Sequence, residues 1–241
     1  MKTVVISQPM YFPWVGMLEQ MRVADAWIHL DDAQFSKGGF MNRVQVKTDQ
    51  GLRWLTVPLQ DHVLETPLNE IRPATHDWPR KHLTTLTQSL AGALYRDDMV
   101  TLVESVFQNA ASENLAQIGT ESMECLARYF EVLPGEIYRA SSMGVAGGGS
   151  QRVLELCKVA GANRYVTGHG ARTYLDHAAF ESAGIRVDYL DYQRRIYPQQ
   201  HGAFTPHVTA LDLVANQGVA GREVIDSPTV YWEEFLKRFT E

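Results

Sequence analysis

The sequence contains little cysteine and no long apolar run. Cys125 and Cys157 are its only cysteines among 241 residues, which excludes the disulfide framework of small secreted proteins. The first apolar run, residues 4–6, is interrupted at once by Ser7 and Gln8, so it is too short for a signal peptide. No stretch approaches the roughly 20 apolar residues that cross a membrane. We therefore expect a cytoplasmic protein with no membrane span.

The sequence also lacks an excess of positive charge and the spacings of metal motifs. Lys and Arg number 22 against 28 Asp and Glu, which gives a net charge of −6 and no general attraction to nucleic acid. The histidine pairs His76/His82 and His201/His207 do not have the spacing of a zinc motif, and no cysteine lies beside them. We expect no metal and no resident cofactor.

The residues that are present alternate between strand and helix patterns. Hydrophobic residues make up 45% of the chain, enough for a sizeable core. The patterns predict strands at 3–8, 26–31, 136–141, 164–167 and 185–190, and helices at 17–24, 151–160 and 176–183. Strand and helix alternation implies parallel pairing. The sequence therefore predicts an α/β fold with a Rossmann-like parallel sheet.

Other elements are predicted outside this alternation. Two β-type runs at 40–48 and 52–59 flank Asp49-Gln50-Gly51 and predict a β-hairpin. Helical patterns begin at Asp77 and continue at 97–110 and 113–130, so we expect a single domain over 1–241 with 77–130 as a helical insertion. The remaining predictions are a short strand at 69–72, a helix at 210–216 and a last helix at 229–239.

The loop after the first predicted strand is the best candidate for a site. In open α/β sheets the ligand crevice lies beyond the carboxyl ends of the strands. Gln8, Tyr11 and Trp14 follow the first strand, and Asp31 and Asp32 end the second. We expect these side chains to face one crevice.

The two aspartates differ in their expected roles. Neighbours on a strand point to opposite faces, and the alternative for Asp31 is a cap on the following loop. Asp32 is the preferred catalytic carboxylate, as a general base for an attacking amine. His29, two residues before Asp31, is expected to pack within the sheet.

Further polar residues lie on the predicted hairpin and after the fourth strand of the sheet. Asn42, Arg43 and Lys47 suit a phosphate or carboxylate, with a solvated hairpin face as the alternative. His169 lies between two glycines and before Tyr174, where it is a second candidate acid or base. A hydrogen-bonded structural histidine is the alternative.

Three weaker candidates complete the set. Gln199, Asp212 and Asn216 lie near Tyr197 and Phe204 and would suit the hydroxyls of a sugar. The Gly147-Gly148-Gly149-Ser150 loop would suit a diphosphate at a helix N-terminus, or is a flexible loop. Both cysteines lie on apolar helix faces, which favours burial over a covalent thioester mechanism.

The chain resembles the WbqC-like protein family. The resemblance rests on Gln8-Pro9-Met10-Tyr11-Phe12-Pro13-Trp14-Val15-Gly16, Leu30-Asp31-Asp32-Ala33-Gln34-Phe35, Asn42-Arg43, Trp54-Leu55-Thr56-Val57-Pro58, Tyr174-Leu175, Tyr197-Pro198-Gln199 and Leu211-Asp212-Leu213 with Asn216. It implies a role in polysaccharide or O-antigen biosynthesis. The implied activity is transfer of an acyl or aminoacyl group, such as glycine, to the amine of a nucleotide-linked amino sugar.

The resemblance leaves two other functions open. One is a nucleotide-dependent, carboxylate-activating enzyme, although the sequence lacks the His-x-x-His pair of adenylating nucleotidyltransferases. The other is a non-catalytic module that binds a sugar nucleotide or an acyl carrier protein. An acyl carrier protein charged with an aminoacyl group is also the expected donor for transfer. It is generally acidic, and Arg80-Lys81 or Arg194-Arg195 would offer it a basic patch.

Overall fold

A computed structural model describes residues 1–63 and 65–239. The strands are β1 (Thr3–Ser7), β2 (Ala26–His29), β3 (Arg43–Thr48), β4 (Gly51–Thr56), β5 (Glu136–Arg139), β6 (Arg164–Thr167), β7 (Arg186–Leu190) and β8 (Thr229–Tyr231). The α-helices are α1 (Val15–Val23), α2 (Trp78–Ser89), α3 (Arg96–Ala110), α4 (Leu115–Tyr129), α5 (Gly149–Val159), α6 (His177–Ser182), α7 (Ala210–Gln217) and α8 (Trp232–Lys237). Short 3₁₀ helices are η1 (Ala140–Ser142), η2 (His169–Thr173) and η3 (Gly218–Val224). No helix in these described ranges is long and apolar enough to cross a membrane.

Six strands form one sheet in the order β5-β2-β1-β6-β7-β8. The first five are parallel and β8 pairs antiparallel with β7. If the five parallel strands are numbered 1 to 5 along the chain, they lie in the sheet in the order 3-2-1-4-5. This is the order of a Rossmann sheet. The predicted fold class is therefore confirmed, including the separate antiparallel hairpin β3-β4.

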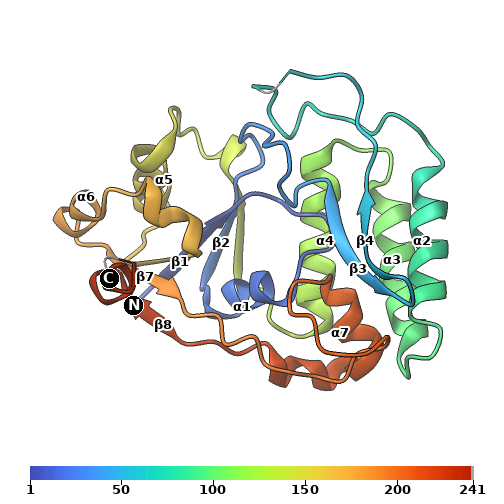
Figure 1. Ribbon diagram of the computed structural model, residues 1–241. Coiled ribbons are helices and arrows are strands. Elements are labelled where there is room, and N and C mark those ends of the chain that lie inside the picture. Colours follow the sequence, from blue (N-terminus) through green and yellow to red (C-terminus); the bar gives the residue numbers. More distant parts are fainter. Residues whose placement is uncertain (64, 240–241) are drawn as a thin grey trace.

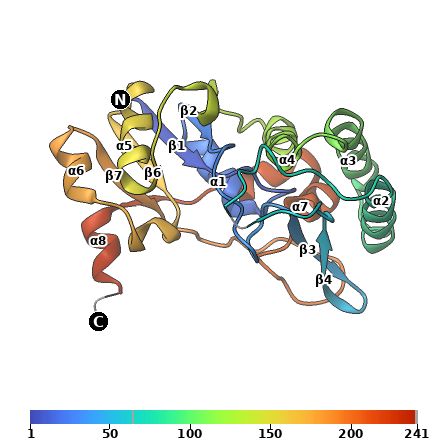
Figure 2. The same cartoon turned by 90° about the horizontal axis from the view of Figure 1, so that it is seen from above.

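Alternation along the strands divides the core into two layers. Val4 and Ile6 of β1 pack with α5, α6 and α8, whereas Val5 packs with α1, α4 and α7. Figure 1 shows α5 and α6 on one side of the sheet, and α1, α4 and α7 on the other. The hairpin and α2–α4 extend the second layer, as the view from above in Figure 2 shows.

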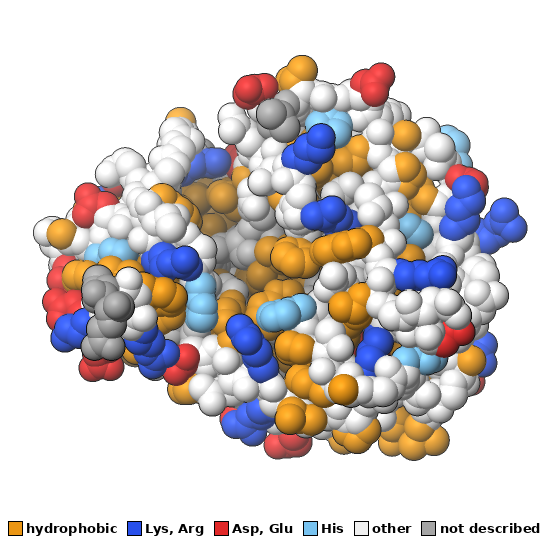
Figure 3. All heavy atoms as spheres, viewed as in Figure 1, with side chains coloured by type: hydrophobic (Ala, Val, Ile, Leu, Met, Phe, Trp, Pro, Cys, Tyr) orange, Lys and Arg blue, Asp and Glu red, His pale blue; other side chains and the backbone are white. Residues whose placement is uncertain are grey.

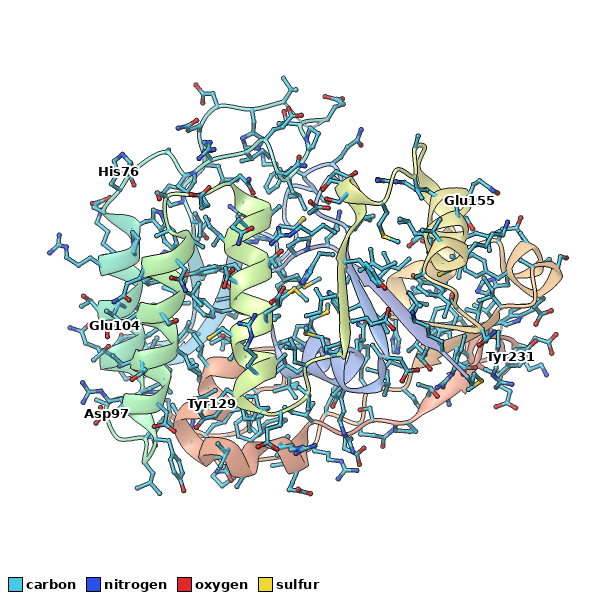
Figure 4. All side chains as sticks on the ribbon, turned by 180° about the vertical axis from the view of Figure 1, so that it is seen from behind. His76, Asp97, Glu104, Tyr129, Glu155 and Tyr231 are labelled. Atoms are coloured by element: carbon cyan, nitrogen blue, oxygen red, sulfur yellow. The ribbon has the colours of Figure 1, made fainter. Side chains whose placement is uncertain are left out.

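The helical section lies between two neighbouring strands of the sheet. It follows β2 in the chain, together with the hairpin, and ends before β5, which pairs with β2. Figure 4, seen from behind, shows α2, α3 and α4 side by side, with Asp97 and Glu104 of α3 at the outer surface. The opposite side of α3 buries Met99, Val103 and Val106, so the helical section shares a hydrophobic core with the sheet.

Two predicted elements differ in the structure. Residues 69–72 do not form a strand, because Pro67 and Pro73 flank them and the backbone turns there. The predicted helix at 229–239 begins later, at Trp232, because residues 229–231 pair with β7 as β8. Asp77 stands at the N-cap of α2, and its side chain makes no cap hydrogen bond.

Candidate functional site

A hollow marks the side of the molecule where the parallel strands end. In Figure 3 it lies between the half carrying α5 and α6 and the half carrying the hairpin, and Lys, Arg and His side chains stand around it. β2 and β6 both pair with β1, so their carboxyl ends are about 10 Å apart at the usual strand spacing. Asp32 follows β2 and His169 follows β6, which places both loops at the same edge of the sheet.

Asp31 has a structural role at this edge. Its side chain is buried, and its two oxygens accept hydrogen bonds from the Ser141 amide at 3.0 Å and the Ser141 hydroxyl at 2.6 Å. Ser141 belongs to η1, after β5. Asp31 therefore joins the ends of two neighbouring strands, and both of its oxygens are occupied.

Only one of the two carboxylate oxygens of Asp32 has a hydrogen-bond partner among the described residues. Its Oδ2 accepts a hydrogen bond from Nη2 of Arg152 at 2.6 Å, and Arg152, on α5, also donates through Nε to the Val145 carbonyl at 3.0 Å. The Oδ1 atom of Asp32 is buried and has no hydrogen-bond partner among the described residues. A buried acceptor without a partner is costly, so a hydrogen-bond donor that reached this oxygen would remove the cost.

His169 has one ring nitrogen fixed by the backbone. Its Nε2 lies 2.9 Å from the Leu190 carbonyl, so Nε2 carries the hydrogen and donates it. The Nδ1 atom is then the acceptor of the neutral ring. The imidazole is half-buried and packs against Tyr192 and Phe235, at centroid distances of 5.0 and 4.8 Å.

Aromatic rings connect the loops at this edge. The Trp14 indole contacts Tyr192 at 4.9 Å and His207 at 5.1 Å. The Tyr192 hydroxyl accepts a hydrogen bond from Gln20, and burial raises the pKa of Tyr192, so the phenol stays neutral. A Cβ at Gly168 would lie 3.2 Å from both polar groups of this Gln20–Tyr192 pair. Glycine there lets the β6 loop approach them closely.

The other two residues from the β1 loop lie differently. The Gln8 amide is half-buried and donates to the Gln34 carbonyl at 3.4 Å. Tyr11 lies in the core, with no exposed area, because its hydroxyl bonds to Nδ1 of His82 at 2.8 Å and its ring packs on Trp78. Tyr11 thus supports the loop from beneath and does not line the hollow.

The hairpin residues have partners of their own. Asn42 donates to the Val57 carbonyl at 3.1 Å. Arg43 donates to the carbonyls of Gly38 and Gly39, and its guanidinium lies 4.3 Å from the centroid of the Trp54 ring. Of the two, Arg43 has the more accessible polar group, stacked on an exposed indole.

Four predicted substrate-binding residues gather in a buried network instead of the hollow. Lys47 is 6% exposed and donates to Gln199 at 3.3 Å and to the Gly202 carbonyl at 3.0 Å. Asn216 donates to the Asp212 carbonyl at 2.8 Å. Burial raises the pKa of Asp212 to about 6. The network fastens the loop after β7 to the hairpin and α7, and it leaves Oδ1 of Asp212 buried without a hydrogen-bond partner among the described residues.

Tyr174 and the glycine loop are exposed. Tyr174 ends η2 and is 52% exposed. Gly147 and Gly148 are exposed, and the α-helix begins at Gly149, two residues earlier than expected. Arg152 lies in the first turn of this helix, so the glycine loop is near the Asp32 ion pair.

The cysteines and the metal-ligating residue types offer no alternative centre in the described ranges. Burial raises the pKa of Cys125 to about 11 and also raises that of Cys157, so both thiols stay protonated near neutral pH, unlike a nucleophilic thiolate. Nowhere in residues 1–63 and 65–239 do three His, Cys, Asp or Glu side chains gather in an arrangement that would hold a metal ion.

Comparison with known proteins places the chain in a family. The WbqC-like protein family matches residues 8–224. The chain belongs to this family. A relative from Mycobacterium tuberculosis, described as an uncharacterized protein, is 31% identical over 220 residues, which cover 90% of this chain and 95% of the relative. No solved structure matches the chain.

The WbqC-like match begins at Gln8 and includes every candidate site residue. It also includes residues that sequence reasoning did not select: Arg152, Ser141, Gln20, Tyr192 and His207. Tyr192 follows β7, so the strand-end rule applied to that strand would have found it. Arg152 gave no signal, because its role depends on contact with Asp32, a residue remote in the chain.

Proposed function

We propose that this WbqC-like protein is an acyl or aminoacyl transferase. In this proposal it places a small group, glycyl above all, on the amine of a nucleotide-linked amino sugar in polysaccharide or O-antigen biosynthesis. The observation that carries the proposal is Asp32, which has one oxygen bound to Arg152 and the other buried without a partner at the carboxyl edge of the sheet.

The chemistry requires a base at this position. The acyl donor is a thioester. The amine nitrogen bonds to the acyl carbon, the bond between that carbon and the thioester sulfur breaks, and the amine loses one proton. Oδ1 of Asp32 takes the proton, and the departing thiolate receives it as the donor leaves. A positioned base contributes about 10²- to 10⁴-fold to such a step. Arg152 fixes the orientation of the carboxylate.

Side chains from the other loops at this edge of the sheet support an amino-sugar acceptor. The Trp14 indole lies between Tyr192 and His207, and such a ring packs on the apolar face of a sugar. His169 offers Nδ1 as an acceptor from the neighbouring loop, so it is the second base candidate. Arg43, stacked on Trp54, and the exposed glycine loop beside Arg152 would suit the phosphates of the nucleotide.

The donor in this proposal is an acyl carrier protein thioester. Of the two basic pairs considered for docking, Lys81 is bound to Asp77 and Arg195 to Asp226. Arg80 and Arg194 are both exposed. Each pair therefore offers one exposed guanidinium to an acidic carrier.

The test is a mass-spectrometric assay with glycyl carrier protein and nucleotide-linked amino sugars. Asp32→Asn keeps the shape and removes the base, so we expect a rate loss of about 10²-fold or more. Asp49→Asn, in the exposed hairpin turn, is the matched control and should retain full activity. Equal activity of Asp32→Asn and wild type would remove Asp32 from the mechanism.

His169→Ala and Cys157→Ala separate the remaining mechanisms. His169→Ala should reduce the rate if Nδ1 shares the proton transfer, and Cys157→Ala should be neutral because its thiol is buried. Activity lost only in the cysteine variant would point to a covalent acyl-enzyme. Binding of the sugar nucleotide by wild type with no transfer to any amino sugar would instead indicate a binding module.

A further inference from the structure

The register of the β3-β4 hairpin determines which backbone groups point away from it. The Val57 amide donates to the Asn42 carbonyl at 2.8 Å, which makes these two residues a hydrogen-bonded pair of the antiparallel ladder. Hydrogen-bonded and non-hydrogen-bonded pairs alternate along such a ladder. The amides and carbonyls of Leu52, Trp54 and Thr56 therefore point away from β3.

The opposite edge of the hairpin, formed by β3, is covered. The Gln45 carbonyl accepts a hydrogen bond from the Thr209 amide at 2.9 Å. The Lys47 carbonyl accepts one from the hydroxyl of Ser89, the last residue of α2. The start of α7 and the end of α2 thus close this side.

The edge formed by β4 is open over two residues. The Thr56 carbonyl is hydrogen-bonded to His82 of α2. The amides and carbonyls of Leu52 and Trp54 make no hydrogen bond to another described segment, and both residues are exposed, as is Arg53 between them. We call the outward-facing backbone of residues 52–54 the β4 edge. Unpaired backbone of this kind is a template for an added strand.

Two apolar side chains stand on one face of the β4 edge. Leu52 and Trp54 are two residues apart, so they point to the same face, and they are 48% and 42% exposed. The Trp54 ring packs against Phe40, which is also exposed, with ring centroids 5.9 Å apart. Figure 3 shows apolar side chains over the hairpin, beside the hollow. Alternate apolar side chains of an added strand would pack on this face.

The charges beside the β4 edge are basic. Arg53 points to the face opposite Leu52 and Trp54 and is exposed, and the Arg43 guanidinium lies 4.3 Å from the centroid of the Trp54 ring. Asp49, in the turn, is the only acidic residue between positions 43 and 56. This hairpin is therefore locally basic in a chain of net charge −6, which favours an acidic partner.

The same charge argues against a second copy of the chain at this edge. If two copies paired their β4 edges antiparallel, through Leu52 and Trp54, the Arg53 residues of the two copies would face each other. In such a non-hydrogen-bonded pair the Cα atoms are about 4.5 Å apart, and like charges directly opposite each other are destabilising.

We propose that the β4 edge binds an extended acidic segment of a partner protein, which adds to the hairpin as a third strand. The segment exchanges backbone hydrogen bonds with Leu52 and Trp54. It carries an acidic residue opposite Arg53 and apolar residues on both sides of that residue. The proposal goes beyond the proposed function, since peptide binding requires neither the donor nor the acceptor of the transfer reaction.

The test is a fluorescence-polarisation titration of the full-length protein with a labelled octapeptide in which valine and glutamate alternate. Wild type should bind this glutamate peptide saturably, and hydrogen exchange of the Leu52 and Trp54 amides should slow when it binds. A lysine peptide, with lysine in place of each glutamate, should bind at least about fivefold more weakly because it faces Arg53 with a like charge.

Two N-methylated peptides test the register. In the proposed pairing the valines lie opposite Leu52 and Trp54, so the valine amides point toward β4 and the glutamate amides point to solvent. N-methylation of the valine amides should weaken binding at least about tenfold. N-methylation of the glutamate amides leaves the same side chains and is the matched control, which should retain more of the binding.

The variant Arg53→Glu should exchange the preference between the peptides. It should bind the glutamate peptide at least about fivefold more weakly than wild type and the lysine peptide more tightly. A gain for one peptide cannot come from a failure to fold. Arg222→Glu is the control, because Arg222 lies in η3, in an exposed ion pair with Glu131, and it should keep the wild-type preference.

Three results would overturn the proposal. They are no saturable binding of the glutamate peptide by wild type, equal binding of the glutamate and lysine peptides, and equal loss of binding on the two patterns of N-methylation. If the protein dimerises and the Leu52 and Trp54 amides are protected only in the dimer, the occupant is a second copy and the proposal is wrong.

Discussion

The contact between α4 and the β1 loop makes Gly119→Ala a sharp test of the site. Gly119 lies inside α4, and a Cβ there would stand 2.8 Å from the carbonyl carbon and Cβ of Pro9 and 2.9 Å from the amide nitrogen of Met10. Ordinary carbon contacts are about 3.5–4.0 Å, so the loop must retreat by roughly 0.7 Å or more. Because two of the three opposing atoms are backbone, a change of side-chain rotamer cannot make the room.

Two opposing contributions determine the stability of the Gly119→Ala variant. Alanine in a helix interior is favoured over glycine by about 1 kcal/mol, whereas overpacking costs about 1–3 kcal/mol. We expect a net destabilisation of about 0–2 kcal/mol. At about 2–4 °C per kcal/mol for a chain of this size, thermal unfolding should occur up to about 8 °C lower.

The effect of Gly119→Ala on function should be larger than the effect on folding. The displaced loop carries Gln8 and Trp14, and a shift of about 1 Å in positioning residues is enough to reduce a rate about 10²-fold. The measurements are thermal and urea unfolding together with the transfer assay. Gly170→Ala is the control, because a Cβ at Gly170 has nothing within 4 Å.

We expect Gly170→Ala to equal or slightly exceed wild type in stability and to retain activity. Helix propensity alone predicts that Gly119→Ala raises the free energy of unfolding by about 1 kcal/mol. If the variant shows this gain and keeps full activity, the close contact between Gly119 and the β1 loop does not position the site.

Four further predictions concern buried groups. Burial lowers the pKa of His82 to about 4, whereas the pKa in the unfolded chain is near 6.5. Between these two values the unfolded chain binds a proton at His82 and the native protein does not. The free energy of unfolding should therefore fall by roughly 3 kcal/mol as the pH drops from about 6.5 to about 4. Denaturant unfolding across this range should show a flatter profile for His82→Gln. Asp212, whose pKa burial raises to about 6, should act in the opposite direction, with stability falling as the pH rises from about 4 to 6; Asp212→Asn should remove this decline. Lys47→Met should lose the hydrogen bonds to Gln199 and the Gly202 carbonyl at about 1–3 kcal/mol, and limited proteolysis should then cleave residues 196–206 faster than in wild type. Thiol-alkylating reagents should modify buried Cys157 only on unfolding and leave binding of ligands to the native protein unchanged.

The sequence was sufficient for most of the fold because its elements repeat a strong pattern. The strands β1 and β2 are mainly apolar, β7 begins with alternating polar and apolar residues, and the helices between the strands have an apolar face. Strand and helix were therefore separable by period. The strand β8 was missed because its three residues run directly into the apolar pattern of Trp232, Phe235 and Leu236. Its pairing with β7 is a tertiary contact that no local pattern records.

The sequence predicts only those site residues that directly follow a strand. Asp31, Asp32 and His169 follow strands, and the strand-end rule places them at one edge of the sheet. Their partners come from elsewhere: Ser141, Arg152 and the Leu190 carbonyl. Which side chains face inward in a loop depends on such partners, so Tyr11 and Lys47 could not be assigned to the core from the sequence.

The pairing of β2 with β5 has a consequence for how the chain folds. It joins residues 26–29 to residues 136–139, so it closes a loop of about 110 residues, which costs roughly 2 kcal/mol more than closing a ten-residue turn. Prior formation of the hairpin and α2–α4 shortens the effective loop. We therefore expect folding to begin within 30–135 and the β5 edge to close last, in a slow phase that separates formation of the helices from completion of the sheet.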